Sequence, residues 1–223
     1  MSGIDILEVR ESILNNNDEL AAQIRRRMDK EQTFLVNIMG SPGAGKTTLL
    51  KAAVEYLKND HRLGVIEADV DSDVDAREIS KSGVRVIQLH TGGLCHLDAK
   101  MTGEGLTALG TADLDIVFVE NIGHLVCPAE FDIGAALQVI ILSIPEGDDK
   151  PLKYPLMFET GDCILVNKTD ASGVFDFDMD IFKKNVSALN PNAEIMAVSA
   201  LKGEGIDAWI EYLKARIKEW KKH

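Results

Sequence analysis

The stretch G-S-P-G-A-G-K-T, residues 40–47, decides the fold of this chain. It matches the phosphate-binding pattern G-x-x-x-x-G-K-[ST] at every fixed position. Residues 33–39 before it are mostly apolar, which predicts a buried strand, and residues 48–57 after it carry apolar side chains at helical spacing. A strand, a glycine-rich loop and a helix in this order are the context that the motif requires, so we predict a phosphate-binding loop.

The chemistry of the loop follows from its residue types. Glycines allow backbone N–H groups to close around phosphate oxygens, and the following helix adds N-terminal donors and the positive end of its dipole. We expect Lys46 to reach the β- and γ-phosphates and the Thr47 hydroxyl to bind Mg²⁺. The predicted nucleotide-contacting residues of this loop are Gly40, Ser41, Gly43, Ala44, Gly45, Lys46, Thr47 and Thr48.

The rest of the chain alternates predicted strands with predicted helices. Its 223 residues, 45% hydrophobic and 27% charged, suit one α/β domain with a complete core. This alternation predicts a three-layer, doubly wound, mostly parallel sheet. We expect residues 31–223 to form this domain, with residues 145–158 as a surface loop that is either a mobile flap or a contact surface.

Residues 1–30 are expected to form an N-terminal amphipathic helical arm. Apolar residues recur at helical spacing from Ile4 to Met28, which predicts one or two helices with a break at residues 15–18 (N-N-N-D). Packing of the arm on the domain is the simpler interpretation, and dimerisation or docking of a partner is the more specific one.

Charge, hydropathy and cysteine content argue against several classes of protein. A net charge of −12 and a pI near 4.8 disfavour a nucleic-acid-binding surface. No apolar run reaches the roughly 18 residues of a membrane span. Three cysteines, few and odd in number, favour a reducing compartment, so we expect a cytoplasmic protein with neither nucleic acid nor membrane as a partner.

Acidic residues after the predicted strand at 63–68 are candidates for a Mg²⁺ site. A loop that leaves the carboxyl edge of a parallel sheet is where ligands bind in doubly wound folds. We therefore expect a switch-like loop near the γ-phosphate, in which Asp75 either joins the Mg²⁺ shell or caps the helix at 76–81. The aspartates of this loop are Asp69, Asp71, Asp73 and Asp75.

The strand at 115–120 ends in Glu120 and continues into Asn-Ile-Gly123, where GTPases usually carry D-x-x-G. We expect Glu120 to hold the Mg²⁺ shell or a water molecule, and the Gly123 amide to meet the γ-phosphate. No catalytic glutamine or arginine finger is evident, so intrinsic hydrolysis should be slow. The expected catalytic set is Lys46, Asp75, Glu120 and Gly123.

The base is predicted to be guanine, because Asn167-Lys-Thr-Asp170 fits N-K-x-D after a late strand. The acceptor-only carboxylate of Asp170 matches the N1–H and N2–H₂ donors of guanine, whereas adenine would leave it unpaired. Lys168 is expected to lie along the base while Asn167 braces the loop. The backbone of Ser199-Ala200 is expected to reach guanine O6. An ATP-using enzyme is the alternative.

Cys95, His96 and Cys127 lie on two loops that are predicted to leave the same sheet edge as the phosphate loop. Thiolate and imidazole suit Zn²⁺ or Ni²⁺ rather than Mg²⁺. Three ligands leave such a site incomplete, so water, His124 or the same groups of a second subunit would supply the rest. The alternative is that these are small core residues, as we expect for Cys163 inside its apolar strand.

Two segments resemble a known family. Residues 91–98, T-G-G-L-C-H-L-D, and residues 120–128, E-N-I-G-H-L-V-C-P, resemble HypB, the GTPase family that helps insert nickel into [NiFe] hydrogenase. The resemblance covers essentially the whole chain from Phe34 onward. It implies the dimerising SIMIBI class of P-loop GTPases, which includes the signal-recognition GTPases and the urease accessory GTPase.

By this resemblance, the chain is expected to be a GTP-hydrolysing metallochaperone that delivers nickel during hydrogenase maturation. Its ligands would be GTP, Mg²⁺ and either Ni²⁺ or Zn²⁺, the last two bound by Cys95, His96 and Cys127 at the interface of a GTP-dependent homodimer. Its partners would be another maturation protein and the hydrogenase large subunit. The chain departs from many family members in having neither cysteine nor histidine before His61.

Two other functions remain open. The first is a regulatory GTPase or adaptor whose cysteines are merely structural. The second is a related metallocentre-assembly GTPase of the urease or cobalamin type, although the Cys-Pro-His element of the urease relative is missing here.

Overall fold

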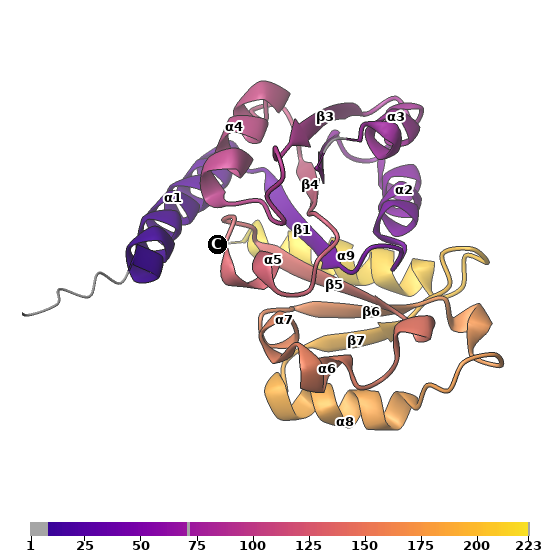
Figure 1. Cartoon of the computed structure of the whole chain (residues 1–223). Helices are drawn as coiled ribbons and strands as arrows, with labels where there is room; N and C mark the ends of the chain where they lie inside the picture. The colour runs from indigo at the N-terminus through magenta and orange to yellow at the C-terminus, as the bar shows by residue number, and fades with distance from the viewer. Residues whose placement is uncertain (1–8, 71, 223) are drawn as a thin grey trace, which may run out of the picture.

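Seven strands form one sheet in the order β3-β2-β4-β1-β5-β6-β7 (Figure 1). The computed structural model describes residues 9–70 and 72–222, with side chains from residue 14 onward. All neighbouring strands in this described part of the chain are parallel, which confirms the predicted doubly wound sheet. The strands are β1 (Phe34–Gly40), β2 (Leu63–Asp69), β3 (Arg85–His90), β4 (Ile116–Glu120), β5 (Leu137–Ser143), β6 (Cys163–Asn167) and β7 (Glu194–Ala197).

Helices cover both faces of the sheet and complete the three predicted layers (Figure 1). The helices are α1 (Val9–Glu31), α2 (Lys46–Leu57), α3 (Val74–Ser80), α4 (Ala99–Leu109), α5 (Cys127–Glu130), α6 (Lys150–Lys153), α7 (Pro155–Glu159), α8 (Met179–Leu189) and α9 (Ile206–Trp220), with 3-10 turns η1 (Ile144–Glu146) and η2 (Thr169–Ala171). Within the described residues, no helix combines the length and apolar character that crossing a membrane requires.

Strand β1 shows how the two faces are built. Val36 and Ile38 pack on the side of α2 and α9, whereas Leu35 packs with α1 and α4, and Met39 with α7 and α8. Side chains alternate along a strand, so a central strand that is covered on both faces must be apolar at nearly every position. Burial of each such side chain contributes about 1.5–3 kcal/mol to the free energy of folding. The resulting core holds the carboxyl edge of the sheet in place.

Helix α1 continues through residues 15–18, so the predicted break there is wrong. The reason is tertiary: the buried Asn17 amide donates to the Asp132 carbonyl at 2.8 Å and accepts from the Ala99 N–H at 2.8 Å. Farther along, Ile24 and Met28 pack against the sheet and α4. Residues 1–8, where the predicted arm starts, lie outside the described residues.

The segment at 145–158, which the sequence predicted to be a surface loop, is helical rather than a loop. It forms η1, α6 and α7, and each helix carries a proline at its first or second position, where the missing N–H costs no helical hydrogen bond. Met157 and Phe158 are fully buried against β5, β6 and α8. These two side chains anchor the segment in the core, while Leu152 and Leu156 on the same segment are 66% and 41% exposed.

Candidate nucleotide and metal sites

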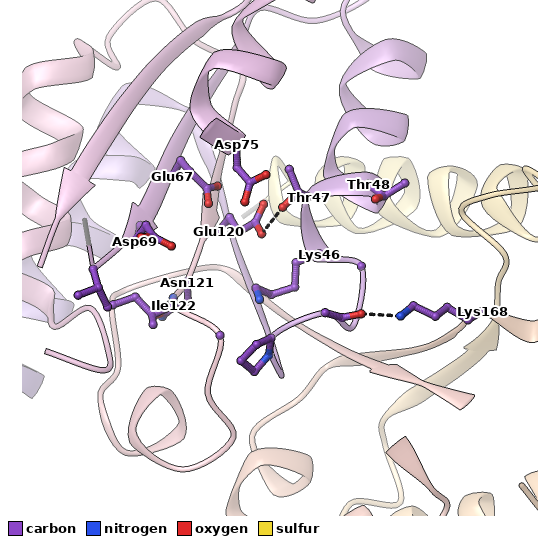
Figure 2. A pocket seen from close by; sticks show the side chains of 16 residues that line it. Lys46, Thr47, Thr48, Glu67, Asp69, Asp75, Glu120, Asn121, Ile122 and Lys168 are labelled. Atoms are coloured by element: carbon purple, nitrogen blue, oxygen red, sulfur yellow. Dashed lines mark hydrogen bonds between the residues drawn. The ribbon is translucent and has the colours of Figure 1, made fainter. Parts of the chain in front are cut away.

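A cavity of about 660 Å³ opens at the carboxyl ends of β1, β2 and β4 (Figure 2). Ligands bind at this edge in doubly wound sheets because loops from neighbouring strands diverge there. The expected site residues that line the cavity are Gly43, Gly45, Lys46, Thr47, Thr48, Asp75, Glu120, Gly123 and Lys168. Unexpected lining residues include Glu67, Asn121 and Ile122.

The phosphate loop has the backbone that its glycines predict. Gly45 has φ +98°, and a Cβ there would lie 2.3 Å from Nδ2 of Asn167, so both conformation and space require glycine. Helix α2 begins at the next residue, and the free N–H groups of its first turn lie at the end of the helix that borders the cavity. Lys46 is 8% exposed, and its ammonium donates to the Ser41 carbonyl at 3.3 Å. Gly40 and Ala44 belong to the loop backbone outside the cavity lining.

The cavity contains a pair of buried carboxylates that sequence reasoning only half identified. Glu120 accepts a hydrogen bond from the Thr47 hydroxyl at 2.8 Å, and Glu67 lies opposite Glu120 in the β2–β4 register (Figure 2). Each acid is 3% exposed. Burial and the adjacent Glu120 raise the pKa of Glu67 to about 10, and burial also raises the pKa of Glu120. Glu67 was detectable in principle, because it is an acid inside an apolar strand.

The buried acids leave oxygens available. Among the described residues, none hydrogen-bonds to Oε2 of Glu67 or Oε2 of Glu120, although both atoms are buried. An unsatisfied buried carboxylate is costly, which indicates that the pair receives a cation when the site is filled. Asp75 lies beside the pair in Figure 2 and completes an acidic wall opposite Lys46 and Thr47.

The aspartates of the predicted switch loop differ in whether they face the cavity. Asp69 and Asp75 line the cavity, while Asp73 forms an exposed ion pair with Arg77. The cap prediction for Asp75 is wrong, because α3 begins at Val74 and its N-cap position is Asp73. Asp71 lies outside the described residues.

The predicted base-binding loop contacts the phosphate loop directly. The Asn167 amide donates to the Ala44 carbonyl at 2.8 Å and accepts from the Ala200 N–H at 3.1 Å. The Lys168 ammonium donates to the Gly43 carbonyl at 2.6 Å. Asn167 therefore links the phosphate loop to the loop that follows β7.

Asp170 lies in η2, directly after this loop, and contacts Ser199. One of its carboxylate oxygens accepts a hydrogen bond from the Ser199 hydroxyl, which lowers the pKa of Asp170. The carboxyl group is therefore an ionised acceptor at neutral pH. Its position beside Ser199-Ala200 assembles the predicted guanine-reading residues around one loop cluster.

Cys95, His96 and Cys127 come together although 32 residues separate the two cysteines. Their ligand atoms all lie within 4.8 Å of one another, and the two Sγ atoms are 2.7 Å apart. All three side chains are half-buried. In the part of the chain that the structure describes, this is the only group of three or more such residues with metal-binding spacing.

The surroundings of the cluster favour coordination of a metal ion by His96. Its ring stacks on Phe131 with centroids 3.9 Å apart and an interplanar angle of 18°. Burial lowers the pKa of His96, which keeps the imidazole neutral and its lone pair available. The neighbouring Cys95 thiol raises the pKa of Cys127 to about 11, so metal binding has to displace a thiol proton.

His124 lies outside this cluster. Its Nδ1 accepts from the backbone N–H groups of Val126 and Cys127 at 3.1 and 3.4 Å. That nitrogen is therefore occupied in shaping the loop. His124 also forms an isolated antiparallel bridge with Gly40, the first residue of the phosphate loop.

The loop after β4 connects the two sites. Gly123 lines the nucleotide cavity and approaches Pro42 so closely that an added Cβ would lie 3.0 Å from it. Cys127 follows four residues later in the metal cluster. The nucleotide cavity and the metal cluster are therefore joined by a short segment of the chain.

The fold and the phosphate loop define a P-loop nucleotide-binding protein, and a family model described as CobW/HypB/UreG, nucleotide-binding domain, matches residues 34–197. Hydrogenase maturation factor HypB of Azotobacter vinelandii is 44% identical over 209 residues, which are 94% of this chain and 69% of the relative. A crystal structure of HypB from Helicobacter pylori in complex with nickel matches with a TM-score of 0.86 and 36% identity, over 92% of this chain and 96% of that chain. This chain belongs to the HypB family.

A more distant likeness concerns the fold alone. The signal recognition particle receptor FtsY from Elizabethkingia anophelis is 12% identical, with a TM-score of 0.57 over 90% of this chain and 73% of that chain. The predicted fold class, shared with signal-recognition GTPases, is thus confirmed.

Proposed function

We propose that this chain is a cytoplasmic, GTP-hydrolysing metallochaperone that delivers nickel during [NiFe] hydrogenase maturation. The cluster of Cys95, His96 and Cys127, attached to the wall of a nucleotide cavity, carries the proposal. The name of the Azotobacter vinelandii relative supports the biological setting, and the nickel complex of the Helicobacter pylori relative supports the cargo. Zn²⁺ suits the same ligands and would compete.

The nucleotide in this proposal is GTP, held through its phosphates by the loop at 40–47 and through its base by Asp170. Lys46 would bind the β- and γ-phosphates, and the Gly123 amide would bind the γ-phosphate. The unpaired oxygens of Glu67 and Glu120 fit a divalent cation, so these acids, Thr47 and Asp75 would hold Mg²⁺. Bound Mg²⁺ would neutralise charge on the phosphates during hydrolysis.

The metal cargo would be held in a GTP-dependent homodimer. Three ligands do not complete a tetrahedral or square-planar site, and a two-fold axis would bring four thiolates together. Leu94 and Val126, which each adjoin a cysteine, are 46% and 44% exposed. Such apolar surface beside an incomplete site favours contact with a second copy. Hydrolysis would loosen the loops, and nickel would pass to a maturation protein or the hydrogenase large subunit.

Removal of the thiols tests the metal role. We expect Cys95→Ser and Cys127→Ser to lose nickel binding in calorimetry while a non-hydrolysable GTP analogue still binds. Cys163→Ala is the matched control, because that cysteine lies in β6 and is fully buried. Nickel affinity equal to that of the wild type in both serine variants would instead favour the regulatory GTPase or adaptor.

Two further measurements test the rest of the proposal. Sedimentation of the wild type with and without the GTP analogue should show a dimer in its presence only. Nickel transfer to apo hydrogenase large subunit, compared with transfer to apo urease, separates hydrogenase maturation from the urease-type alternative.

A further inference from the structure

Asn121 is a buried amide that touches three segments of the site. It is fully buried, and its backbone N–H donates to the Ile38 carbonyl of β1 at 2.9 Å. Its side-chain Nδ2 donates to Oδ1 of Asn37, also on β1, at 3.4 Å. Both bonds hold Asn121 against the strand that leads into the phosphate loop. Strand β1 lies at the centre of the sheet, so it is a rigid anchor.

The other end of the Asn121 side chain holds the two functional loops. Its Oδ1 accepts from the Ile122 N–H at 2.9 Å and from the Leu97 N–H at 3.2 Å. Ile122 lines the nucleotide cavity and precedes Gly123. Leu97 is fully buried and lies two residues after Cys95 in the metal-binding loop. One oxygen thus serves one donor from each loop.

We propose that Asn121 is the positioning residue that couples nucleotide state to metal affinity. This inference rests on the GTP-gated carrier proposed above and names the contact that would carry the gating. Movement of Ile122 and Gly123 toward or away from a γ-phosphate changes the geometry around Oδ1. The Leu97 N–H shares that acceptor and is buried, so it has to follow or lose its only hydrogen bond among the described residues.

The residue type fits this role. An amide supplies one acceptor for the two loops and one donor for β1, and it carries no charge. An alanine would leave two buried N–H groups without their acceptor. The shared acceptor therefore constrains Cys95 and Gly123 relative to each other.

A thermodynamic cycle tests the coupling. Nickel affinity is measured with and without a non-hydrolysable GTP analogue and Mg²⁺, and analogue affinity with and without nickel. In the wild type the two ratios must be equal by linkage, and we expect about 5- to 150-fold, the usual range of allosteric coupling. In Asn121→Ala we expect both ratios to fall to within about twofold of one, whatever the affinity of the variant for each ligand alone.

Asn37→Ala is the matched control. It disrupts the same buried amide network but leaves Oδ1 of Asn121 free to accept from Ile122 and Leu97, so it should keep the wild-type coupling. If Asn121→Ala retains the wild-type ratio, the inference is overturned while the gating proposal stands. If the wild type itself shows no coupling, both are overturned.

A second measurement does not depend on a folded variant. Hydrogen exchange of the wild type is compared with and without the GTP analogue, in the absence of nickel. We expect the Leu97 and Ile122 amides to change protection together. A change in protection at Ile122 with none at Leu97 would contradict the inference. Asn121→Ser is a less disruptive substitution than Asn121→Ala for the thermodynamic cycle of nickel and analogue binding.

Discussion

Glu67 of β2 and Glu120 of β4 lie opposite each other in parallel register, both buried, at the edge of the sheet where the phosphate loop begins. Two acids so placed repel each other unless a proton or a cation lies between them. The Thr47 hydroxyl reaches Glu120, which puts the pair next to the motif residue expected to bind Mg²⁺. We infer that the pair lowers the folding stability of the protein without a cation and that it is present because it binds a cation.

Glu67→Gln tests that trade-off. The amide has nearly the same shape but lacks the charge, so we expect Mg²⁺ affinity in the presence of GDP to fall about tenfold or more, equivalent to about 1.4 kcal/mol. The melting temperature without ligands should stay equal or rise. Glu104→Gln, on the exposed side of α4, is the control and should change neither. A destabilised variant with normal Mg²⁺ affinity would show that Glu67 is merely structural.

The same substitution has a pH signature. The pKa of Glu67 is raised from 4.5 to about 10 in the fold, so the folded protein binds more protons than the unfolded chain across this range. Glu67 therefore lowers stability progressively as the pH rises above its unfolded pKa. We expect the difference in melting temperature between Glu67→Gln and the wild type to widen from about pH 5 to about pH 8. A constant difference would argue against the raised pKa.

Asp170→Asn should change the base that is accepted. The asparagine side chain offers an N–H where the carboxylate offered an acceptor, so the guanine N2–H₂ group loses its partner and meets a donor. We expect GDP affinity to fall by a factor of about 100 or more and XDP, which carries a carbonyl at C2, to bind more tightly than GDP. Competition with a fluorescent nucleotide measures both. Unchanged GDP affinity would refute guanine reading by Asp170.

Phe131→Ala should weaken metal binding without touching a ligand. The ring stacks on His96, and its removal frees the imidazole to rotate away from the thiols. We expect nickel affinity to fall about 3- to 10-fold, corresponding to about 0.5–1.5 kcal/mol for an aromatic pair. Phe175→Ala, which removes a ring that is 45% exposed, is the control. Equal nickel affinity in all three proteins would mean that stacking does not position His96.

Asn17→Ala should destabilise the fold. It leaves the buried Ala99 N–H and the half-buried Asp132 carbonyl without their partner, and a buried group left in this way costs about 1–3 kcal/mol. We therefore expect a loss of about 2–4 kcal/mol in the free energy of unfolding by urea. Asn16→Ala, at an exposed position of the same helix, should be neutral or slightly stabilising. A similar loss of stability in both variants would refute the view that the two hydrogen bonds of the Asn17 side chain stabilise the fold.

The sequence alone specified features that depend on neighbours along the chain. The phosphate loop at 40–47, the N-K-x-D loop at 167–170 and the alternation of strands and helices are local patterns, because backbone conformation and periodicity are set over a few residues. Cys95, His96 and Cys127 could be nominated together, since loops at one edge of a parallel sheet converge. Their approach to within 4.8 Å could not be read from spacing.

The tertiary structure decided what depends on register and packing between distant segments. Pairing of β2 with β4 sets Glu67 against Glu120 across 53 residues of chain, and packing of α1 satisfies Asn17 so that the helix does not break. The shared acceptor of Asn121 likewise depends on a loop 24 residues away. Such contacts form because buried polar groups must find partners wherever the fold brings them, and no local pattern encodes that place.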